Sequence, residues 1–193
     1  MMNLLITLHD RIFGALETHL APALLPGLAR LLFVGVLFMY YWNAGLTKTG
    51  EGVMGLFQLS SGAYIQILPR AVEAVGYDPS ALGALARAVV LFGTWAEFVL
   101  PILLAVGLFT RLAAFGMIGF VLVQTWVDVM GHGAVLGTWF DRYPDGLIDV
   151  RAFWIFPLIL LMLRGGGPIS ADAALSRWYQ PSSAALAAAS RPR

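Results

Sequence analysis

A single carboxylate interrupts a long apolar run near the middle of the chain. Glu97 lies close to the centre of the 23 residues between Arg87 and Arg111, and Pro101 follows it four positions later. A charge in hydrocarbon costs at least about 2.5 to 3.5 kcal/mol, so this carboxyl group must be neutral, paired or next to water. The proline ring also leaves the backbone carbonyl of residue 97 without its helical donor. Glu97 is therefore a candidate for proton handling or for a quinone headgroup site, or else a protonated carboxyl group that bonds a neighbouring helix.

Three polar side chains recur at four-residue spacing in the next apolar run. Gln124, Asp128 and His132 stand at i, i+4 and i+8, which predicts that they share one slowly turning face of a helix. An acid and an imidazole at the mouth of a bundle could exchange protons with a quinone as it is reduced. The alternative is a solvated His132 that neutralises Asp128 or the end of its helix. Asn43, in the first apolar run, is a fifth candidate, either for the same path or for a hydrogen bond between helices.

The composition excludes several kinds of chemistry. The 193 residues include no cysteine, which excludes disulfides, thiolate metal sites and a cysteine nucleophile. The three histidines do not stand at ligand spacing, so no metal site is predicted. Twelve basic against eleven acidic residues leave no excess of positive charge, and nucleic acid is not an expected partner. Redox chemistry would then need a quinone or a partner chain, and no covalent cofactor is expected.

The elements that must position these residues are membrane-spanning helices. Hydrophobic residues make up 59% of the chain and charged residues 12%, with a mean hydropathy of +0.78, which predicts an all-α integral membrane protein in a lipid bilayer. A spanning helix needs about 17 to 25 apolar residues. Charges and turn residues divide the chain into a predicted four-helix bundle with spans at about 29–47, 86–108, 111–130 and 147–164. The last span is the weakest because only 12 residues separate Arg151 from Arg164, and Arg151 is expected to extend to the headgroups.

The remaining segments are read from their apolar pattern and their turn residues. Leucine or isoleucine recurs at every fourth position from Leu4 to Leu20, which predicts that 1–27 is an interfacial helix lying on the membrane. The stretch 47–82 is expected to be a structured loop at the mouth of the bundle. Residues 1–178 then form one transmembrane domain, and 179–193 form a flexible Ala/Ser/Pro-rich tail. Arginines at span ends favour cytoplasmic termini, and three of them are expected at the headgroups: Arg30, Arg87 and Arg111.

The segment 95–114, WAEFVLPILLAVGLFTRLAA, resembles the signature of the DoxX family of small four-span bacterial membrane proteins. The resemblance is carried by a carboxylate in the second span, an apolar run and a Gly-Leu-x-Thr-Arg connection, here Glu97, Gly107, Leu108, Thr110 and Arg111. Two further segments, RLLFVGVLFMYYWNAGLTK and GGGPISADAALSR, resemble the first span and the glycine-rich close of the family. The similarity extends over about residues 29–178.

The resemblance implies a four-helix bundle in the bacterial cytoplasmic membrane. It also implies an integral subunit associated with a quinone-linked membrane oxidoreductase or respiratory assembly, with Pro101, Gly107 and Arg111 in structural roles. Two alternatives remain open, a non-catalytic accessory subunit of a larger membrane complex and a small transporter or lipid-handling protein. The sequence contains no nucleotide loop and no hydrolase or metalloprotease motif, so an independent enzyme is not expected.

Overall fold

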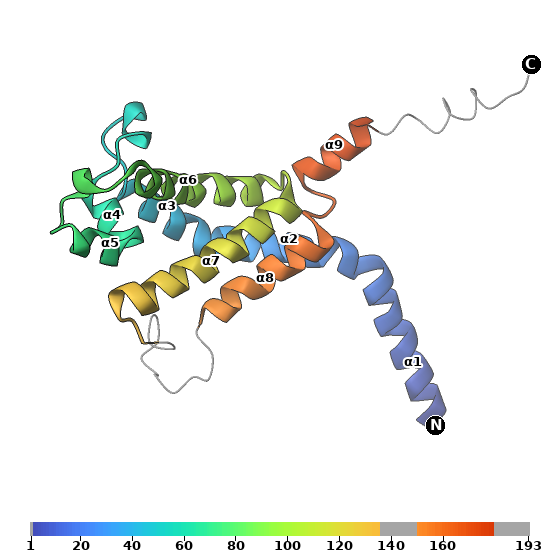
Figure 1. The fold of residues 1–193 in the computed structure, drawn as a ribbon. Coiled ribbons are helices and arrows are strands. Elements are labelled where there is room, and N and C mark those ends of the chain that lie inside the picture. Colours follow the sequence, from blue (N-terminus) through green and yellow to red (C-terminus); the bar gives the residue numbers. More distant parts are fainter. Residues whose placement is uncertain (1, 136–149, 180–193) are drawn as a thin grey trace, which may run out of the picture.

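The computed structural model describes residues 2–135 and 150–179, which are helical apart from their connections (Figure 1). Within these ranges there is no strand, and the only extended pairing is an isolated bridge between Thr49 and Leu59. The predicted all-α class is confirmed. Most of the predicted tail, 179–193, lies outside the described residues, as do the first residues of the predicted fourth span, 147–149.

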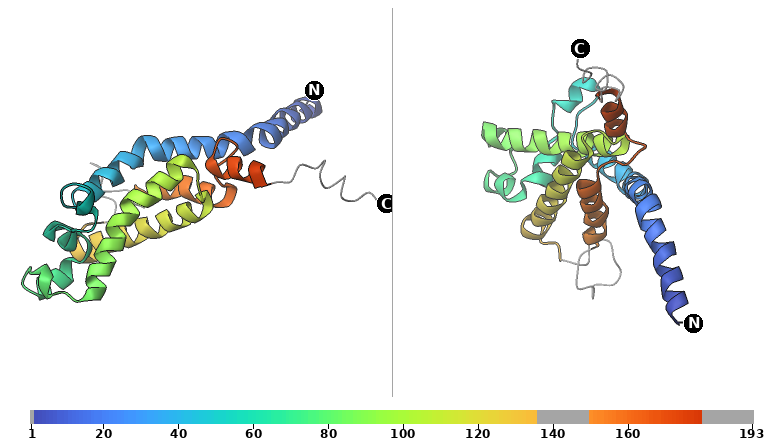
Figure 2. Two further views of the ribbon diagram at one scale, coloured as in Figure 1. Left: turned by 90° about the horizontal axis from the view of Figure 1, so that it is seen from above. Right: turned by 90° about the vertical axis from the view of Figure 1, so that its right-hand side faces the viewer.

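The first described element is a continuous but bent helical segment, Met2–Leu46 (Figure 1). Its parts are α1 (Met2–Ala15), a π-helical turn (Leu16–Leu20), α2 (Ala21–Phe33), a second π-helical turn (Val34–Phe38) and α3 (Met39–Leu46). Figures 1 and 2 show α1 projecting beyond the other helices, and none of its residues is buried.

The predicted interfacial segment at 1–27 and the predicted first span from residue 29 belong to one continuous helical segment, and no helix ends between them. Pro22 stands near the start of α2, directly after the π-helical turn. Proline has no N–H, so it donates no backbone hydrogen bond at this position. Pro26 lies inside α2 and removes one helical hydrogen bond, and the helix continues past it. Proline therefore interrupts the hydrogen-bond ladder at two points without separating two elements.

The second and third predicted spans agree with the structure to within two residues at each end. They are α6 (Ala84–Val106) and α7 (Thr110–His132), which are joined by a short turn. Gly107 ends α6 with φ of 73°, the left-handed conformation that glycine adopts without steric cost. This glycine lets the chain reverse at once, so the two long helices lie against each other.

Two shorter helices follow in the described part of the chain, α8 (Arg151–Arg164) and α9 (Ala171–Tyr179). In the bundle α2 packs on α8, α8 on α7, α7 on α6 and α6 on α3, as Figures 1 and 2 show. The core is built from apolar residues on the facing sides of these helices: Ala29, Phe33, Leu37, Tyr41, Leu104, Ala113, Ala114, Met117, Val121, Trp154, Leu158 and Leu161.

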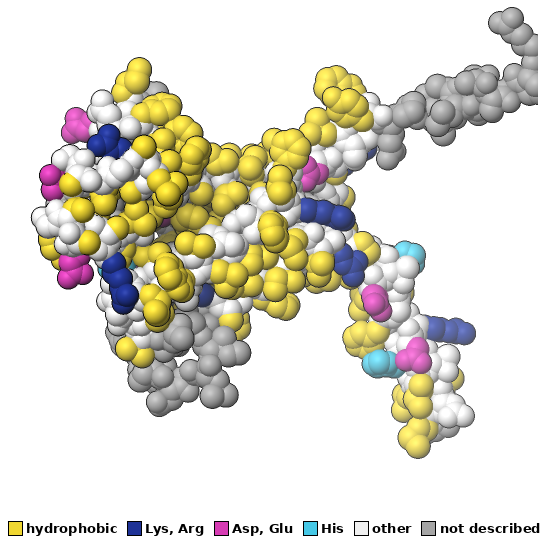
Figure 3. Space-filling model, in the orientation of Figure 1, with side chains coloured by type: hydrophobic (Ala, Val, Ile, Leu, Met, Phe, Trp, Pro, Cys, Tyr) yellow, Lys and Arg dark blue, Asp and Glu magenta, His cyan; other side chains and the backbone are white. Residues whose placement is uncertain are grey.

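Three helices of the described chain are long and apolar enough to cross a membrane: Met2–Leu46, Ala84–Val106 and Thr110–His132. Figure 3 shows apolar side chains over the middle of the bundle, with most of the charged ones near its ends and along α1. At 14 residues α8 is shorter than the roughly 17 that a span requires. By length and composition, the described chain thus has three candidate membrane-spanning helices.

The stretch 47–82 is compact and mostly helical, as the expectation of a structured loop requires. It contains two short 3₁₀ turns (Val53–Leu56 and Pro79–Ala81), α4 (Ser61–Ile67) and α5 (Pro69–Ala74). Ser60 begins α4 by accepting a hydrogen bond from the N–H of Ala63 at 3.2 Å. Because α4 packs on α6 and α5 packs on α7, this segment covers the end of the bundle where α3 ends.

Candidate functional site

Glu97 forms a buried ion pair with a lysine from the first helix. The Nζ atom of Lys48, two residues beyond the end of α3, donates to Oε1 of Glu97 at 3.0 Å and to Oε2 at 2.9 Å. A third bond runs to the backbone carbonyl of Ala44 at 3.0 Å, so every ammonium donor is used. The two residues are only 4% and 6% exposed. Glu97 is thus a paired carboxylate, and neither Arg30, Arg87 nor Arg111 is its partner.

A glycine brings the two helices close enough for this pair to form. A Cβ on Gly45 would lie 2.5 Å from the ring of Phe98, the residue next to Glu97. The indole of Trp42 packs edge-on against the same ring, with centroids 5.1 Å apart. Only glycine at position 45 permits this crossing of α3 and α6, and the crossing places Lys48 beside the carboxylate.

A second buried ion pair joins α7 to α8. Nη2 of Arg151 donates to Oδ2 of Asp128 at 2.7 Å, and Nη1 donates to the hydroxyl of Thr125 at 2.8 Å. The guanidinium carbon also lies 5.9 Å from the ring centroid of Trp154. Arg151 is 3% exposed, so the expectation that it extends to the headgroups is wrong. The buried carboxylate of Asp128 holds the guanidinium inside the bundle instead.

Gln124 connects two tyrosines of the first helix between these ion pairs. Its Nε2 donates to the hydroxyl of Tyr40 at 2.9 Å, and its Oε1 accepts from the hydroxyl of Tyr41 at 3.3 Å. The ring of Tyr40 packs on Trp154 with centroids 5.3 Å apart, and Tyr41 is fully buried. The amide therefore joins α3 to α7 through both of its polar atoms.

We call these eight side chains the polar seam: Tyr40, Tyr41, Lys48, Glu97, Gln124, Thr125, Asp128 and Arg151. Gln124 bonds both tyrosine hydroxyls, Arg151 bonds Thr125 and Asp128, and Lys48 bonds Glu97. The seam carries two positive and two negative charges, so it is neutral as a whole. Hydroxyl, amide and carboxylate groups in series can hold and pass protons.

Two predicted members do not belong to the polar seam. His132 is exposed, and its Nε2 lies 3.1 Å from the backbone carbonyl of Gln66 on α4. At about 100° per residue, Asp128 lies about 40° around the helix from Gln124 and His132 about 80°, so the drift of this face carries His132 out of the interior. Asn43 is also exposed, because it stands about 200° around the helix from Tyr41. The predicted stripe therefore divides, with Gln124 and Asp128 inside and His132 outside.

Arg30 joins three segments at the other end of the bundle. Its guanidinium donates to the carbonyls of Leu104 at 3.1 Å and Ala105 at 2.6 Å, and to those of Gly166 at 3.2 Å and Ile169. These carbonyls belong to the last turn of α6 and to the turn after α8, where the helix dipole is negative. The expectation that Arg30 lies among headgroups is wrong, since the side chain is bound to backbone oxygens.

The three residues expected to be structural lie at or near that end. A Cβ on Gly107 would meet Ser170 at 2.7 Å and Arg30 at 2.9 Å, which leaves no room for a side chain. Pro101 is buried inside α6, and the helix continues through it. Arg111 is exposed at the start of α7. Gly107 and Pro101 therefore have packing roles, whereas Arg111 has no partner in the described chain to hold it.

Lys48 and Arg151 are the site residues that reasoning from the sequence missed. Each was taken for a cation at the end of a span, because hydropathy treats each charge by itself. Gly45, one turn before Lys48, is a signal of a close helix crossing that could have placed the lysine near another helix.

Comparison with protein-family models, curated proteins and solved structures found no match for this chain. Its function must therefore be argued from the polar seam, from the helices that surround it and from the residues that resemble a known family.

Proposed function

We propose that this chain is a small integral membrane subunit of the DoxX type that works within a quinone-linked membrane oxidoreductase or respiratory assembly. The observation that carries the proposal is the polar seam, in which two buried ion pairs flank a Tyr–Gln–Tyr bridge. In this proposal four helices cross the bilayer, and α8 is one of them. The resemblance of 95–114 to the DoxX signature supports the same assignment.

The energetic cost of the seam argues for a function. Transfer of an ion from water into a low-dielectric interior costs several kcal/mol even after relaxation, and pairing recovers only part of this cost. Apolar residues of similar volume often stabilise a fold better than a buried ion pair does. Ionisable groups inside a membrane bundle accordingly mark proton relays and ligand sites. Four of them are buried in this small bundle, in two ion pairs: Lys48 with Glu97, and Arg151 with Asp128.

The donor set fits a quinone headgroup in its chemistry. When bound, a quinone would accept electrons from the assembly and take up protons. The rings of Tyr40 and Trp154 offer aromatic faces, and the hydroxyls of Tyr40 and Tyr41 can donate protons that Gln124 and the carboxylates help to replace. The chain itself would position the ring and hold protons, while the electrons come from a partner, since it has no cysteine.

The proposed placement follows from charge and exposure. The resemblance to the DoxX family favours a bacterial cytoplasmic membrane, and basic residues at the ends of the spans favour cytoplasmic termini. The apolar side chains of α1 are exposed along its whole length, as Leu4, Leu8 and Ile12 show. This supports the proposal that α1 lies at the membrane surface beside the bundle.

The test is gentle extraction of the native assembly, followed by mass spectrometry of the chains and quinones that accompany this protein. The proposal expects a stoichiometric redox partner and bound quinone. In the assembly, the double variant Glu97→Gln with Lys48→Gln removes both charges and should lower the rate of quinone reduction at least about tenfold. The control is Glu73→Gln, which changes an exposed carboxylate and should leave that rate unchanged. A lone protein without quinone, or full activity in the double variant, would refute it.

A second candidate is a non-catalytic accessory subunit of a larger membrane complex. It is favoured by the completeness of the seam, because all three donors of Lys48 are used and both carboxylates are paired. Such a network can simply fix the packing of four helices. Retained activity with loss of assembly in the same double variant would select this candidate.

A further inference from the structure

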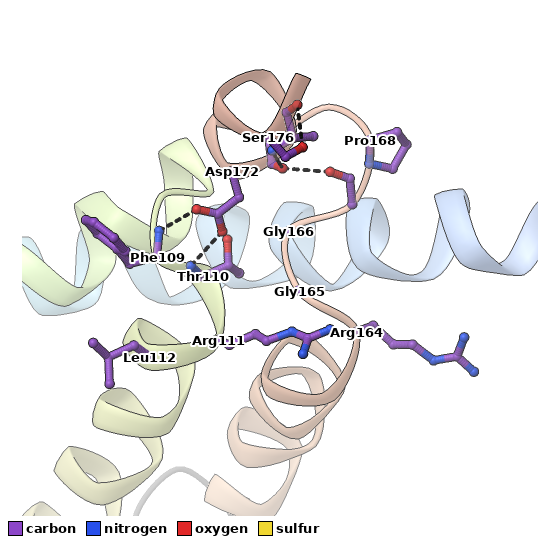
Figure 4. A pocket seen from close by; sticks show the side chains of 13 residues that line it. Phe109, Thr110, Arg111, Leu112, Arg164, Gly165, Gly166, Pro168, Asp172 and Ser176 are labelled. Carbon is purple, nitrogen blue, oxygen red and sulfur yellow. Dashed lines mark hydrogen bonds between the residues drawn. The ribbon is translucent and has the colours of Figure 1, made fainter. Parts of the chain in front are cut away.

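We propose that the cavity between the start of α7, the end of α8 and α9 binds the phosphate group of an anionic phospholipid. This cavity has a volume of about 570 Å³ and lies at the end of the bundle away from the connecting segment 47–82 (Figures 1 and 4). The inference goes beyond the proposed redox role and rests on one part of it, the placement of the chain in a bilayer.

Most polar groups in the wall of this cavity already have partners. The carboxylate of Asp172 accepts the N–H groups of Phe109 at 2.7 Å and Thr110 at 2.8 Å, and it thereby caps the start of α7 (Figure 4). The hydroxyls of Ser170 and Ser176 each donate to a backbone carbonyl, at 2.6 and 3.0 Å. None of these groups is left to attract a ligand.

Three lining groups have no partner within residues 2–135 and 150–179, and all three are donors. The hydroxyl oxygen of Thr110 is completely buried and makes no hydrogen bond. Arg111 and Arg164 line the same cavity without an ion pair or a hydrogen bond in the described chain. Figure 4 shows the Arg164 side chain pointing away from Arg111, so Arg111 supplies the guanidinium group nearest the hydroxyl of Thr110. A phosphate matches the planar fork of arginine, and Arg164 adds positive charge at the rim.

The glycine-rich turn leaves space beside these donors. A Cβ on Gly166 would lie 2.6 Å from the hydroxyl of Thr110, so only glycine fits beside this hydroxyl. A Cβ on Gly165 would lie 3.6 Å from Nε of Arg111, which places the arginine directly under the turn. Figure 4 shows the side chain of Arg111 reaching from α7 towards the end of α8. The turn and the arginine together form the floor of the cavity.

The surroundings of the cavity favour a lipid as the source of the phosphate. Leu112, Phe115 and Leu163 lie on α7 and α8 just below the arginines and are 70%, 64% and 63% exposed. Arginines at the ends of apolar helices stand at the level of the headgroups, where basic pockets between helices bind anionic lipids. Acyl chains bound to the exposed apolar side chains would leave the phosphate at Arg111 and Thr110.

The experiment is native mass spectrometry of the full chain in detergent, with lipid removed and then added back. Phosphatidylglycerol should bind more tightly than phosphatidylcholine with the same acyl chains. Arg111→Gln should weaken phosphatidylglycerol binding about tenfold, since a charge-assisted bidentate contact is lost, and Arg164→Gln and Thr110→Val should weaken it severalfold. Arg87→Gln is the control, because this arginine stands near the start of α6 and bonds only the carbonyl of Ser80 at 3.3 Å.

The binding measurements distinguish an anionic-lipid site from the alternatives. Equal binding of the two lipids, or unchanged binding in both arginine variants, overturns the proposal. Displacement of the lipid by inorganic phosphate at an equal concentration would assign the site to free phosphate and overturn the lipid source. A protein that binds phosphatidylglycerol but carries no quinone or partner overturns the proposed redox function alone, so the two failures are distinguishable.

Discussion

Lys48 and Glu97 join the end of the first helix to the middle of α6 through two hydrogen bonds of 3.0 and 2.9 Å, with both side chains buried. The lysine reaches this position by folding back along its own helix to the carbonyl of Ala44. A cation at the end of one span thereby neutralises a carboxylate in the interior of another. The pair fixes the axial position of α3 against α6.

Breaking this ion pair from one side should cost more than removing it altogether. Glu97→Gln or Lys48→Met each leaves one buried group without its counter-charge, and we expect each to lower the free energy of unfolding by about 3–5 kcal/mol. The double variant should lose much less free energy of unfolding than the two single variants lose together, because no unpaired charge remains. Thermal unfolding in detergent measures the cycle. Additive losses would mean that the two side chains do not interact.

Gly45→Ala should destabilise the bundle at the crossing of α3 and α6. Its Cβ would lie 2.5 Å from the ring of Phe98, and overpacking of this kind costs about 1–3 kcal/mol. Gly27→Ala is the matched control in the same long helix, because nothing lies within 4 Å of its Cβ position. That variant should be neutral or slightly stabilising. Phe98→Leu should recover part of the loss in Gly45→Ala, and a loss of equal size at both glycines would contradict the crossing.

The ends of α6 and α7 were predictable from apolar length and from the glycine turn between them. Apolar length fixes how far a helix can run in a membrane, and a glycine with φ of 73° fixes where α6 stops. The predicted spans at 86–108 and 111–130 consequently fall within two residues of α6 and α7. The N-terminal boundary was placed by charges, since Arg30 and Lys48 bracket an apolar run, whereas a single helical segment runs through that boundary with Pro26 inside α2.

The candidate site was predictable only in part because partners across helices depend on rotation and register. Glu97, Gln124 and Asp128 were recognised, since polar residues in apolar runs are conspicuous by themselves. Their cations were not, because Lys48 and Arg151 stand next to span ends, where a lone charge is ordinary. A single sequence gives the face of each helix but not which neighbour that face meets.

Lysine at position 30 should not restore the stability that Arg30 gives to the bundle. Its guanidinium reaches four backbone carbonyls in two segments, and one hydrogen bond to a charged group is worth about 1.5–3 kcal/mol. We expect Arg30→Gln to cost at least that much in unfolding free energy, and Arg30→Lys to recover little, since an ammonium cannot span the fork. Arg11→Gln, on the exposed α1, is the control. Full stability in Arg30→Lys would show that charge alone suffices.

Asp78 gives a prediction about pH outside the membrane-spanning helices. The hydroxyl of Ser80 donates to Oδ1 of Asp78 at 2.6 Å and the Ser80 N–H donates at 2.9 Å, and these bonds hold the pKa of this carboxyl below its ordinary value. They stabilise the ionised form, so their contribution is complete above the unfolded-state pKa and disappears as the pH falls through the lower folded-state pKa. Ser80→Ala should raise the pKa, which carbon-13 NMR of the carboxyl group measures. An unchanged pKa would contradict the role of the hydroxyl.

Gln124 distinguishes a proton path from a structural brace. Gln124→Met removes the amide that joins Tyr40 to Tyr41 while keeping the length of the side chain. The loss of two hydrogen bonds should cost about 1–3 kcal/mol of stability in either case. If protons pass along the seam, the variant also lowers quinone reduction by the assembly well beyond any loss of folded protein, and solvent deuterium slows the wild type more than the variant. Gln66→Met is the control, because that side chain is exposed on α4. Activity that falls only in proportion to folded protein would assign the bridge to packing.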